Sequence, residues 1–133
     1  MKSRYLLDTH VLLWAISEPE KLSDSVRTLL ENENHTLFFS AASIWEIAIK
    51  AALNKPDFRS NAQAIAMGLK QAGYQELEIN AVHAYRIADL PSMHQDPFDR
   101  LLVCQAKSEG LALITNDANI QRYCTGFIEI IRM

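Results

Sequence analysis

The chain has 133 residues, of which 49% are hydrophobic and 22% charged, which is the size and composition of one globular domain with a single core. It has no apolar run of the ~20 residues that a membrane span needs, and residues 1–4 do not resemble a signal peptide, so we expect a cytoplasmic protein without membrane contact. The net charge of -3 gives no overall basic field, so any binding of nucleic acid must be local or assisted by metal ions. Cys104 and Cys124 have no metal-ligand spacing and are expected to be reduced apolar side chains.

The first predicted element is a buried strand that ends at an acidic residue. Residues 5–7 are Tyr-Leu-Leu, Asp8 follows them, and Thr9 begins a short predicted helix that reaches Ile16. In open α/β sheets the ligand crevice lies outside the carboxyl ends of the strands. Asp8 is therefore expected on the floor of such a crevice.

A helix and a second buried strand follow. Ser23 is a good N-cap, and Val26, Leu29 and Leu30 form the apolar stripe of the helix after it. Residues 36–40 are Thr-Leu-Phe-Phe-Ser, an aromatic-rich run of strand length. The second strand is again closed by a small polar residue at a predicted helix start.

A strong helix is predicted from Ala41 to Leu53. Its expected apolar face consists of Ile44, Trp45, Ala48, Ile49 and Ala52. Ser43, Glu46 and Lys50 lie one turn apart on another flank, so Glu46 can point toward the strand ends while Ser43 or Lys50 orients it. The sequence leaves open the alternative that Glu46 is solvated and paired only with Lys50.

The segment from 54 to 88 contains a loop, two helices and an edge strand. The loop 54–60 carries local positive charge, which suits either phosphate contacts or a solvated surface. A helix is predicted over 61–72, a strand over 76–79 and a short helix over 81–88. The side chains expected to face the core are Ala62, Ile65, Ala66, Leu69, Val82, Tyr85, Ile87 and Ala88.

Two acidic residues mark the start of the next helix. Asp96 precedes Pro97, which favours a first helical position, and the helix is predicted to run to Gly110. Asp96 is interpreted mainly as the N-cap, whereas Asp99 both complements the positive helix end and is a candidate for chemistry.

The last third of the chain repeats the pattern of a strand that ends at an aspartate. Residues 111–114 form a short apolar run, Thr115-Asn116-Asp117 closes it, and a final strand is predicted over 127–131. The alternation predicts an α/β fold, a three-layer α/β/α sandwich with a doubly wound parallel sheet of about five strands. In this fold the strands that end at Asp8 and Asp117 flank the switch point, and Asp99 lies at the start of the helix that leads to the second of them.

Four acidic motifs in the chain resemble those of PIN-domain ribonucleases, particularly the VapC-like toxins. The motifs are Leu6-Leu7-Asp8-Thr9-His10, Ser43-Ile44-Trp45-Glu46-Ile47, Asp96-Pro97-Phe98-Asp99-Arg100-Leu101-Leu102 and Leu113-Ile114-Thr115-Asn116-Asp117. The resemblance spans nearly the whole chain, in order, and implies a single PIN-like nuclease domain over residues 1–133.

The resemblance implies a Mg²⁺- or Mn²⁺-dependent endoribonuclease that is the toxin of a toxin-antitoxin pair. Its catalytic and metal-binding carboxylates would be Asp8, Glu46, Asp99 and Asp117. The residues expected to bind substrate or support the site are Thr9, Ser43, Lys50, Arg100, Thr115 and Asn116, with Thr115 supporting the last acid. It also implies an antitoxin partner that covers the acidic groove, and a homodimer. His94 and Asp96 resemble a feature of a subgroup, with no assigned role.

The chemistry of these residue types leads to the same metal. Carboxylates that lie close together repel one another unless a cation joins them, and oxygen ligands without clustered His or Cys favour Mg²⁺ or Mn²⁺ over zinc. One or two such ions can activate a water for attack on a phosphodiester and neutralise charge on the leaving oxygen. Asp8 would be the central ligand, Asp99 and Asp117 would complete the coordination, and Glu46 would bind a second ion or orient the water.

Two other classes of function fit parts of the pattern. A receiver-like signalling domain also has a parallel sheet and an acidic Mg²⁺ pocket, but it needs a phosphoacceptor at a middle strand end, where this chain has Asn80, and a later lysine. A catalytically silent RNA-binding module is the other alternative, although the loss of acids that would mark it is not observed.

Overall fold

The computed structural model describes residues 3–56, 58, 60–91 and 96–133. The strands in this part of the chain are β1 (Arg4–Leu7), β2 (Thr36–Ser40), β3 (Gln75–Leu77), β4 (Ala112–Thr115) and β5 (Ile130–Arg132). The helices are α1 (Thr9–Ser17), α2 (Asp24–Glu31), α3 (Ala41–Ala52), α4 (Ala62–Gln71), α5 (Ala81–Tyr85), α6 (Pro97–Glu109) and α7 (Ala118–Cys124), with 3₁₀ turns η1 (Pro19–Lys21) and η2 (Arg86–Asp89).

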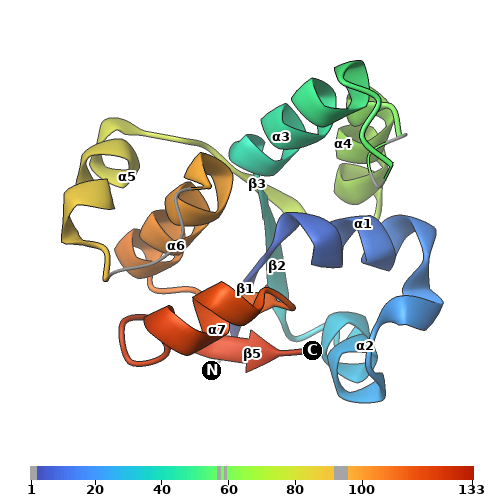
Figure 1. The fold of residues 1–133 in the computed structure, drawn as a ribbon. Helices are drawn as coiled ribbons and strands as arrows, with labels where there is room; N and C mark the ends of the chain where they lie inside the picture. The colour runs from blue at the N-terminus through green and yellow to red at the C-terminus, as the bar shows by residue number, and fades with distance from the viewer. Residues whose placement is uncertain (1–2, 57, 59, 92–95) are drawn as a thin grey trace.

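The strands form one parallel sheet in the order β3-β2-β1-β4-β5 (Figure 1). The chain winds outward from β1 to β3 and then returns to place β4 beside β1, where Tyr5 pairs with Leu37 on one side and with Ala112 on the other. The predicted doubly wound sheet is confirmed, and its switch point lies between β1 and β4. The order also differs from the 2-1-3-4-5 order of flavodoxin-like sheets, which argues against the receiver-like alternative.

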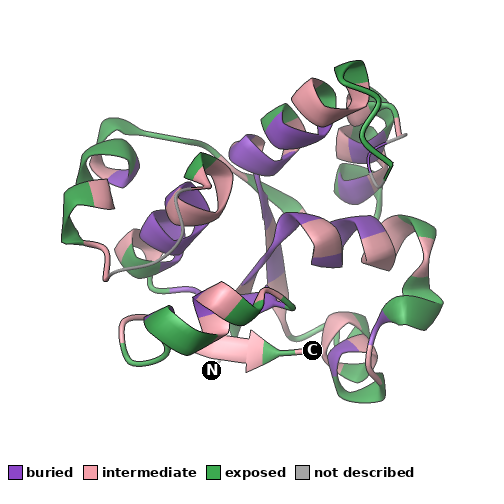
Figure 2. Ribbon diagram, viewed as in Figure 1, coloured by how far each residue is buried: buried purple, intermediate pink, exposed green. Residues whose placement is uncertain are grey.

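Two hydrophobic cores lie on opposite faces of the sheet, as the predicted three-layer sandwich requires (Figures 1 and 2). One core packs α1, α2 and α4 against Leu7, Phe39 and Ile114. The other packs α6 and α7 against Leu6 and Leu113. Successive strand residues point to opposite faces, so Leu6 and Leu7 reach different cores and both are fully buried.

Polar caps fix where the main helices begin. Ser23 accepts from the Val26 N–H, as the sequence predicts, and Asn61 accepts from the Ala64 N–H at the start of α4. Gly110 adopts the left-handed conformation at φ 65° at the end of α6, where a β-carbon is disfavoured. Within the described residues, no helix has the length and apolar character to span a membrane.

The predicted core face of α3 is confirmed at Ile44, which packs against the first core, but is wrong for Trp45, Ala48 and Ala52. The buried residues are Ala42, Ser43, Glu46 and Ile47, whereas Trp45 is 57% exposed. Ala48 and Ala52 are also exposed. The reason is a tertiary contact: the Thr9 hydroxyl lies within hydrogen-bonding distance of Glu46 and Ser43, which holds their flank of the helix inward.

The helix predicted over 81–88 is shorter in the structure and buries a different face. It ends at Tyr85, which is 66% exposed, and continues as the 3₁₀ turn η2. His83 is the buried residue: its Nδ1 accepts the Asn80 N–H at 3.2 Å and its Nε2 lies 2.9 Å from Glu109 Oε2. A reciprocal cap with Asn80 therefore decides which face is buried.

The last strand begins three residues later than predicted. Phe127 and Ile128 belong to a turn in which both of their N–H groups donate to the Cys124 carbonyl oxygen, after Gly126 at φ 110°. Their side chains pack against the second core, and β5 starts only at Ile130, opposite Leu113. Apolar character alone did not separate this turn from the strand.

Candidate active site

Asp8 lies where β1 ends and α1 begins, at the switch point of the sheet. Its N–H continues the ladder to the Ile114 carbonyl oxygen at 2.9 Å, and its side chain caps α1 through the His10 N–H. The Thr115 hydroxyl donates a short hydrogen bond to Asp8 Oδ2. Asp8 is only 4% exposed, and this burial raises the pKa of its carboxyl above the ordinary value although the Thr115 hydrogen bond opposes the rise.

Asp117 occupies the corresponding position after the neighbouring strand, β4. It caps α7 by accepting from the Ile120 N–H at 2.8 Å, and its own N–H donates to the Thr115 hydroxyl oxygen at 2.9 Å. Thr115 thus bridges the two acids, donating to the carboxylate of Asp8 and accepting from the backbone of Asp117. Asn116, which lies between Thr115 and Asp117 in the chain, is exposed.

The start of α6 brings two more acids to the same edge of the sheet. Asp96 Oδ1 accepts from the N–H groups of Phe98 at 2.9 Å and Asp99 at 3.1 Å, which confirms its role as the N-cap. Asp99 is half-buried. Burial, followed by the negative charges of Asp8, Asp96, Asp117 and Glu46, raises the pKa of Asp99 to about 8.

The last of the four predicted acids, Glu46, is 3% exposed on α3 and has two polar partners, Thr9 and Lys50. The Thr9 hydroxyl donates to Glu46 Oε1 at 2.7 Å and lies 2.8 Å from Ser43 Oγ. Lys50 Nζ lies 2.5 Å from Glu46 Oε2. The alternative left open by the sequence is thereby decided: Glu46 pairs with Lys50, but as a buried group rather than a solvated one.

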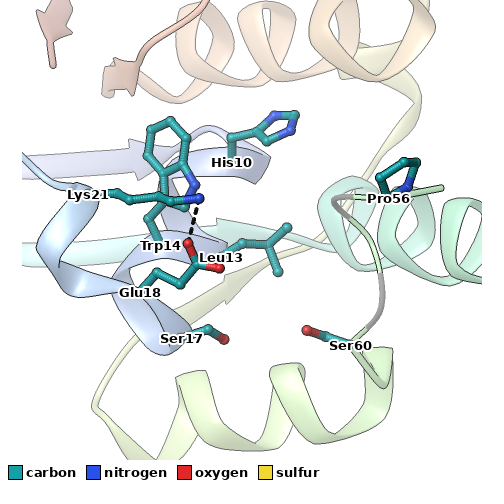
Figure 3. Close-up of a pocket in the computed structure, with 8 residues that line it drawn as sticks. All are labelled: His10, Leu13, Trp14, Ser17, Glu18, Lys21, Pro56 and Ser60. Atoms are coloured by element: carbon teal, nitrogen blue, oxygen red, sulfur yellow. Dashed lines mark ion pairs between the residues drawn. The ribbon is translucent and has the colours of Figure 1, made fainter.

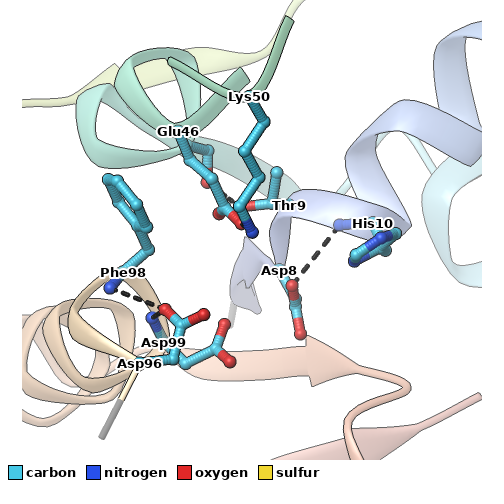
Figure 4. Close-up of polar contacts among 9 residues, drawn as sticks. Asp8, Thr9, His10, Glu46, Lys50, Asp96, Phe98 and Asp99 are labelled. Carbon is cyan, nitrogen blue, oxygen red and sulfur yellow. Dashed lines mark hydrogen bonds and ion pairs between the residues drawn. The ribbon is translucent and has the colours of Figure 1, made fainter. Parts of the chain in front are cut away.

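Lys50 is the cation of this cluster (Figure 4). Burial disfavours its charge, but the hydrogen bond and charge of Glu46, with the charges of Asp96 and Asp99, outweigh burial and raise its pKa. Its ammonium also lies 4.8 Å from the centre of the Phe58 ring. Lys50 is therefore held as a charged group among the acids.

These side chains surround one cavity of about 430 Å³ at the carboxyl ends of the strands, which we call the carboxylate cavity. It is lined by Asp8, His10, Trp14, Glu46, Lys50, Asp96, Asp99, Asn116 and Asp117. The structure therefore brings all four predicted acids together with Lys50 and Asn116. Thr9 and Thr115 are buried and hydrogen-bond to Glu46 and Asp8, and the buried Ser43 lies 2.8 Å from the Thr9 hydroxyl. Arg100 does not line the cavity.

The donor set suits a hard divalent cation, although its geometry is not that of a preformed metal site. Among the described residues, no three Asp, Glu, His or Cys side chains are arranged to hold a metal ion. The acids nevertheless share one cavity, and mutual repulsion contributes to the raised pKa of Asp99. Oxygen ligands that repel one another are the set that Mg²⁺ or Mn²⁺ neutralises best.

Sequence reasoning missed two residues of this cavity, His10 and Trp14. They are four residues apart at the start of α1, so they lie on one face of the helix directly after Asp8. This spacing of four residues after Asp8 is the sequence signal that could have identified them. His94, which the sequence left without a role, lies outside the described residues.

The fold and the site define an α/β domain with a cluster of acids at the switch point of a parallel sheet. The sequence model of the PIN domain matches residues 5–126, and the chain belongs to the PIN domain family. The chain is 29% identical over 122 residues to ribonuclease VapC22 of Mycobacterium tuberculosis, a match that covers 89% of this chain and 90% of that protein. The resemblance to VapC-like PIN domains that the four motifs indicate is confirmed.

Solved structures of VapBC complexes have the same fold. The complex VapBC2 from Rickettsia felis, bound to a DNA fragment from its promoter, contains a chain that matches with a TM-score of 0.68 and 17% identity, over 97% of this chain and 98% of that one. DNA-bound VapBC from Salmonella typhimurium matches with a TM-score of 0.68 and 19% identity, over 99% and 98% of the two chains. At these identities the match concerns the fold alone.

Proposed function

We propose that this protein is a divalent-metal-dependent endoribonuclease and the toxin of a toxin-antitoxin pair. The observation that carries the proposal is the convergence of Asp8, Glu46, Asp99 and Asp117, from four separate parts of the chain, on one cavity at the switch point. Membership of the PIN family and the similarity to a protein named ribonuclease VapC22 support the choice of RNA as substrate.

Asp8, Asp99 and Asp117 are the residues that would hold Mg²⁺ or Mn²⁺, with Glu46 at a second ion or at the attacking water. When bound, the metal lowers the pKa of a water and neutralises charge on the phosphodiester. The protein must supply oriented carboxylates for this purpose. Thr115 donates to Asp8 Oδ2 and the His10 N–H donates to Oδ1 at 3.4 Å, so the carboxylate that lines the cavity has a fixed orientation.

Glu46 and Lys50 form the opposite wall of the same cavity. Thr9 holds one oxygen of Glu46 and Lys50 holds the other, so the carboxylate has a fixed position before substrate arrives. Lys50, with its raised pKa, carries the positive charge that draws a phosphate toward an otherwise acidic cavity. Asn116, exposed on the cavity wall, adds an amide donor for the substrate.

The partners follow from the same proposal. The VapBC neighbours are toxin-antitoxin complexes, which supports a cognate antitoxin as the partner. We further propose that the antitoxin covers the carboxylate cavity and that the protein is a homodimer. Both cysteines are buried and not joined in a disulfide, which suits a reducing cytoplasm.

The test is cleavage of single-stranded RNA by the purified protein with Mg²⁺ or Mn²⁺. We expect cleavage by the wild type, none in excess chelator, and none by Asp8→Asn. Asp24→Asn is the matched control, because Asp24 is an exposed aspartate in the first turn of α2 that does not line the cavity. Cleavage that persists in Asp8→Asn or in chelator would reject the metal mechanism, and RNA binding without cleavage would favour the silent RNA-binding module.

A further inference from the structure

A second cavity adjoins the carboxylate cavity and shares two of its residues. It has a volume of about 350 Å³ and lies between α1, η1 and the loop that carries Pro56 and Ser60. His10 and Trp14 line both cavities. A ligand that extends from the carboxylate cavity past His10 and Trp14 would enter this second cavity, which we call the Trp14 cavity.

The wall between the two cavities is aromatic. The His10 ring lies 6.1 Å from the Trp14 ring and 5.4 Å from the Phe58 ring, in an edge-to-face arrangement with the latter at 71°. Trp14 packs against the first hydrophobic core but remains half-exposed, so its indole is fixed while part of its surface is accessible. Fixed aromatic side chains of this kind are the surfaces on which proteins stack the bases of single-stranded RNA.

Apart from Leu13 and Pro56, the rest of the Trp14 cavity is polar (Figure 3). Glu18 Oε2 and Lys21 Nζ form an ion pair of 2.6 Å, with side chains 46% and 54% exposed, and so form the solvent-exposed rim. Ser17 and Ser60 lie on opposite sides of the cavity. A carboxylate, an ammonium and two hydroxyls offer both acceptors and donors, which suits the hydrogen-bonding edge of a heterocyclic base better than an apolar side chain.

We propose that the Trp14 cavity binds one nucleobase of the RNA strand, stacked on the Trp14 indole and hydrogen-bonded at its edge by Glu18 and Lys21, beside the phosphate in the carboxylate cavity. The proposal rests on the proposed ribonuclease function and adds a subsite that recognises the base next to the cleaved phosphodiester. Trp14 provides affinity for any base, since every base has a stacking face. Glu18 and Lys21 determine which base is preferred, because the hydrogen-bonding edges of the bases differ.

The first test compares cleavage kinetics of Trp14→Ala and Trp14→Phe with Trp45→Ala. Trp45 is the matched control, because it is exposed on α3 and lines neither cavity. Stacking is present in both the ground and transition states, so Trp14→Ala should raise KM about 10-fold with little change in kcat. Trp14→Phe should retain most of the affinity, and the thermal melting of each variant verifies its folding. Glu18→Gln should change the order of preference among RNAs that differ at the base next to the cut.

The second test uses RNA in which the nucleotide next to the cut lacks its base. The wild type should bind this abasic RNA about 10-fold more weakly than the intact RNA, whereas Trp14→Ala should bind both equally. Binding is measured by the fluorescence anisotropy of end-labelled RNA in an Asp99→Asn background, where no cleavage is expected. In a Trp45→Phe, Asp99→Asn background, where Trp14 is the only tryptophan, quenching of Trp14 fluorescence by RNA reports the stacking contact itself.

The outcomes separate the subsite from the proposed function. Quenching of Trp14 by RNA, together with a wild type that does not cleave, would keep the subsite and reject the nuclease. Cleavage with an unchanged KM in Trp14→Ala and no sensitivity to the abasic position would reject the subsite and keep the nuclease. If Trp14→Ala leaves RNA binding intact but abolishes binding of the cognate antitoxin, the cavity holds a protein side chain and the proposal is overturned.

Discussion

Replacing Asp99 by Asn is expected to stabilise the metal-free protein, by an amount that grows with pH. The folded-state pKa of Asp99 is about 8 against an ordinary value of 3.8, so the unfolded chain releases this proton at a much lower pH than the fold does. The sign follows from linkage: stability associated with Asp99 is fully present below about pH 4 and is lost as pH rises through about 8. Because Asn does not titrate, the Asp99→Asn variant does not lose this stability as the pH rises.

The magnitude is set by two opposing effects. A rise from 3.8 to about 8 corresponds to a ceiling of about 6 kcal/mol, which partial exposure and screening reduce to roughly 2–3 kcal/mol. The substitution also removes a charge from the first turn of α6, which costs about 0.5 kcal/mol. Relief of the burial and repulsion of the charge therefore dominates, and at roughly 4 °C per kcal/mol Asp99→Asn should melt about 6–10 °C higher than wild type above pH 8.

The assay is thermal melting in chelator from pH 5 to pH 9. The gap between Asp99→Asn and wild type should be small at pH 5, widen with pH and become constant above pH 8. Asp24→Asn, another exchange in the first turn of a helix, should differ from wild type by a few tenths of a kcal/mol at every pH in this range. An Asp99→Asn variant that melts lower than wild type at pH 9, or a gap that is independent of pH, would refute the electrostatic reasoning.

Three further substitutions test how individual acids are held. Thr115→Val leaves the buried Asp8 carboxylate without its hydroxyl donor, so it should lower the free energy of unfolding by about 1–3 kcal/mol and slow RNA cleavage. Thr115→Ser should restore both properties. Urea unfolding measures the stability, and initial rates measure the cleavage. Lys50→Met leaves Glu46 buried without its cation and should cost about 1–3 kcal/mol, whereas Lys50→Arg should retain most of the stability; equal unfolding curves would contradict the pairing. Asp96→Ala removes the cap of α6 and should cost about 1 kcal/mol in thermal melting, while Asp96→Asn should be close to wild type.

The positions of Asp8 and Asp117 were predictable because local rules determine them. Each follows a short buried strand and each caps the next helix, and parallel strands place both at one edge of the sheet. The cap at Asp96 was predictable for the same reason, since a proline at the first helical position follows it directly.

The parts that could not be predicted depend on contacts between distant residues. The buried flank of α3 is selected by Thr9, which lies 37 positions before Glu46 in the chain. The pairing of His83 with Glu109 spans 26 positions and was equally invisible to a helical pattern. Helical periodicity identifies an apolar stripe, but a buried polar contact can turn the helix away from it.

The central claim, that the four acids form one metal site, is tested most directly by calorimetric titration with Mn²⁺ at pH 7 in two buffers of different ionisation enthalpy. Asp99, with a pKa of about 8, is protonated in most metal-free molecules at this pH and must lose its proton to bind a cation. The account predicts saturable binding to the wild type with release of about one proton per site, and weaker binding without proton release in Asp99→Asn. Saturable binding of equal strength and equal proton release in the two proteins, or no binding to either, would contradict a metal site shared by these carboxylates.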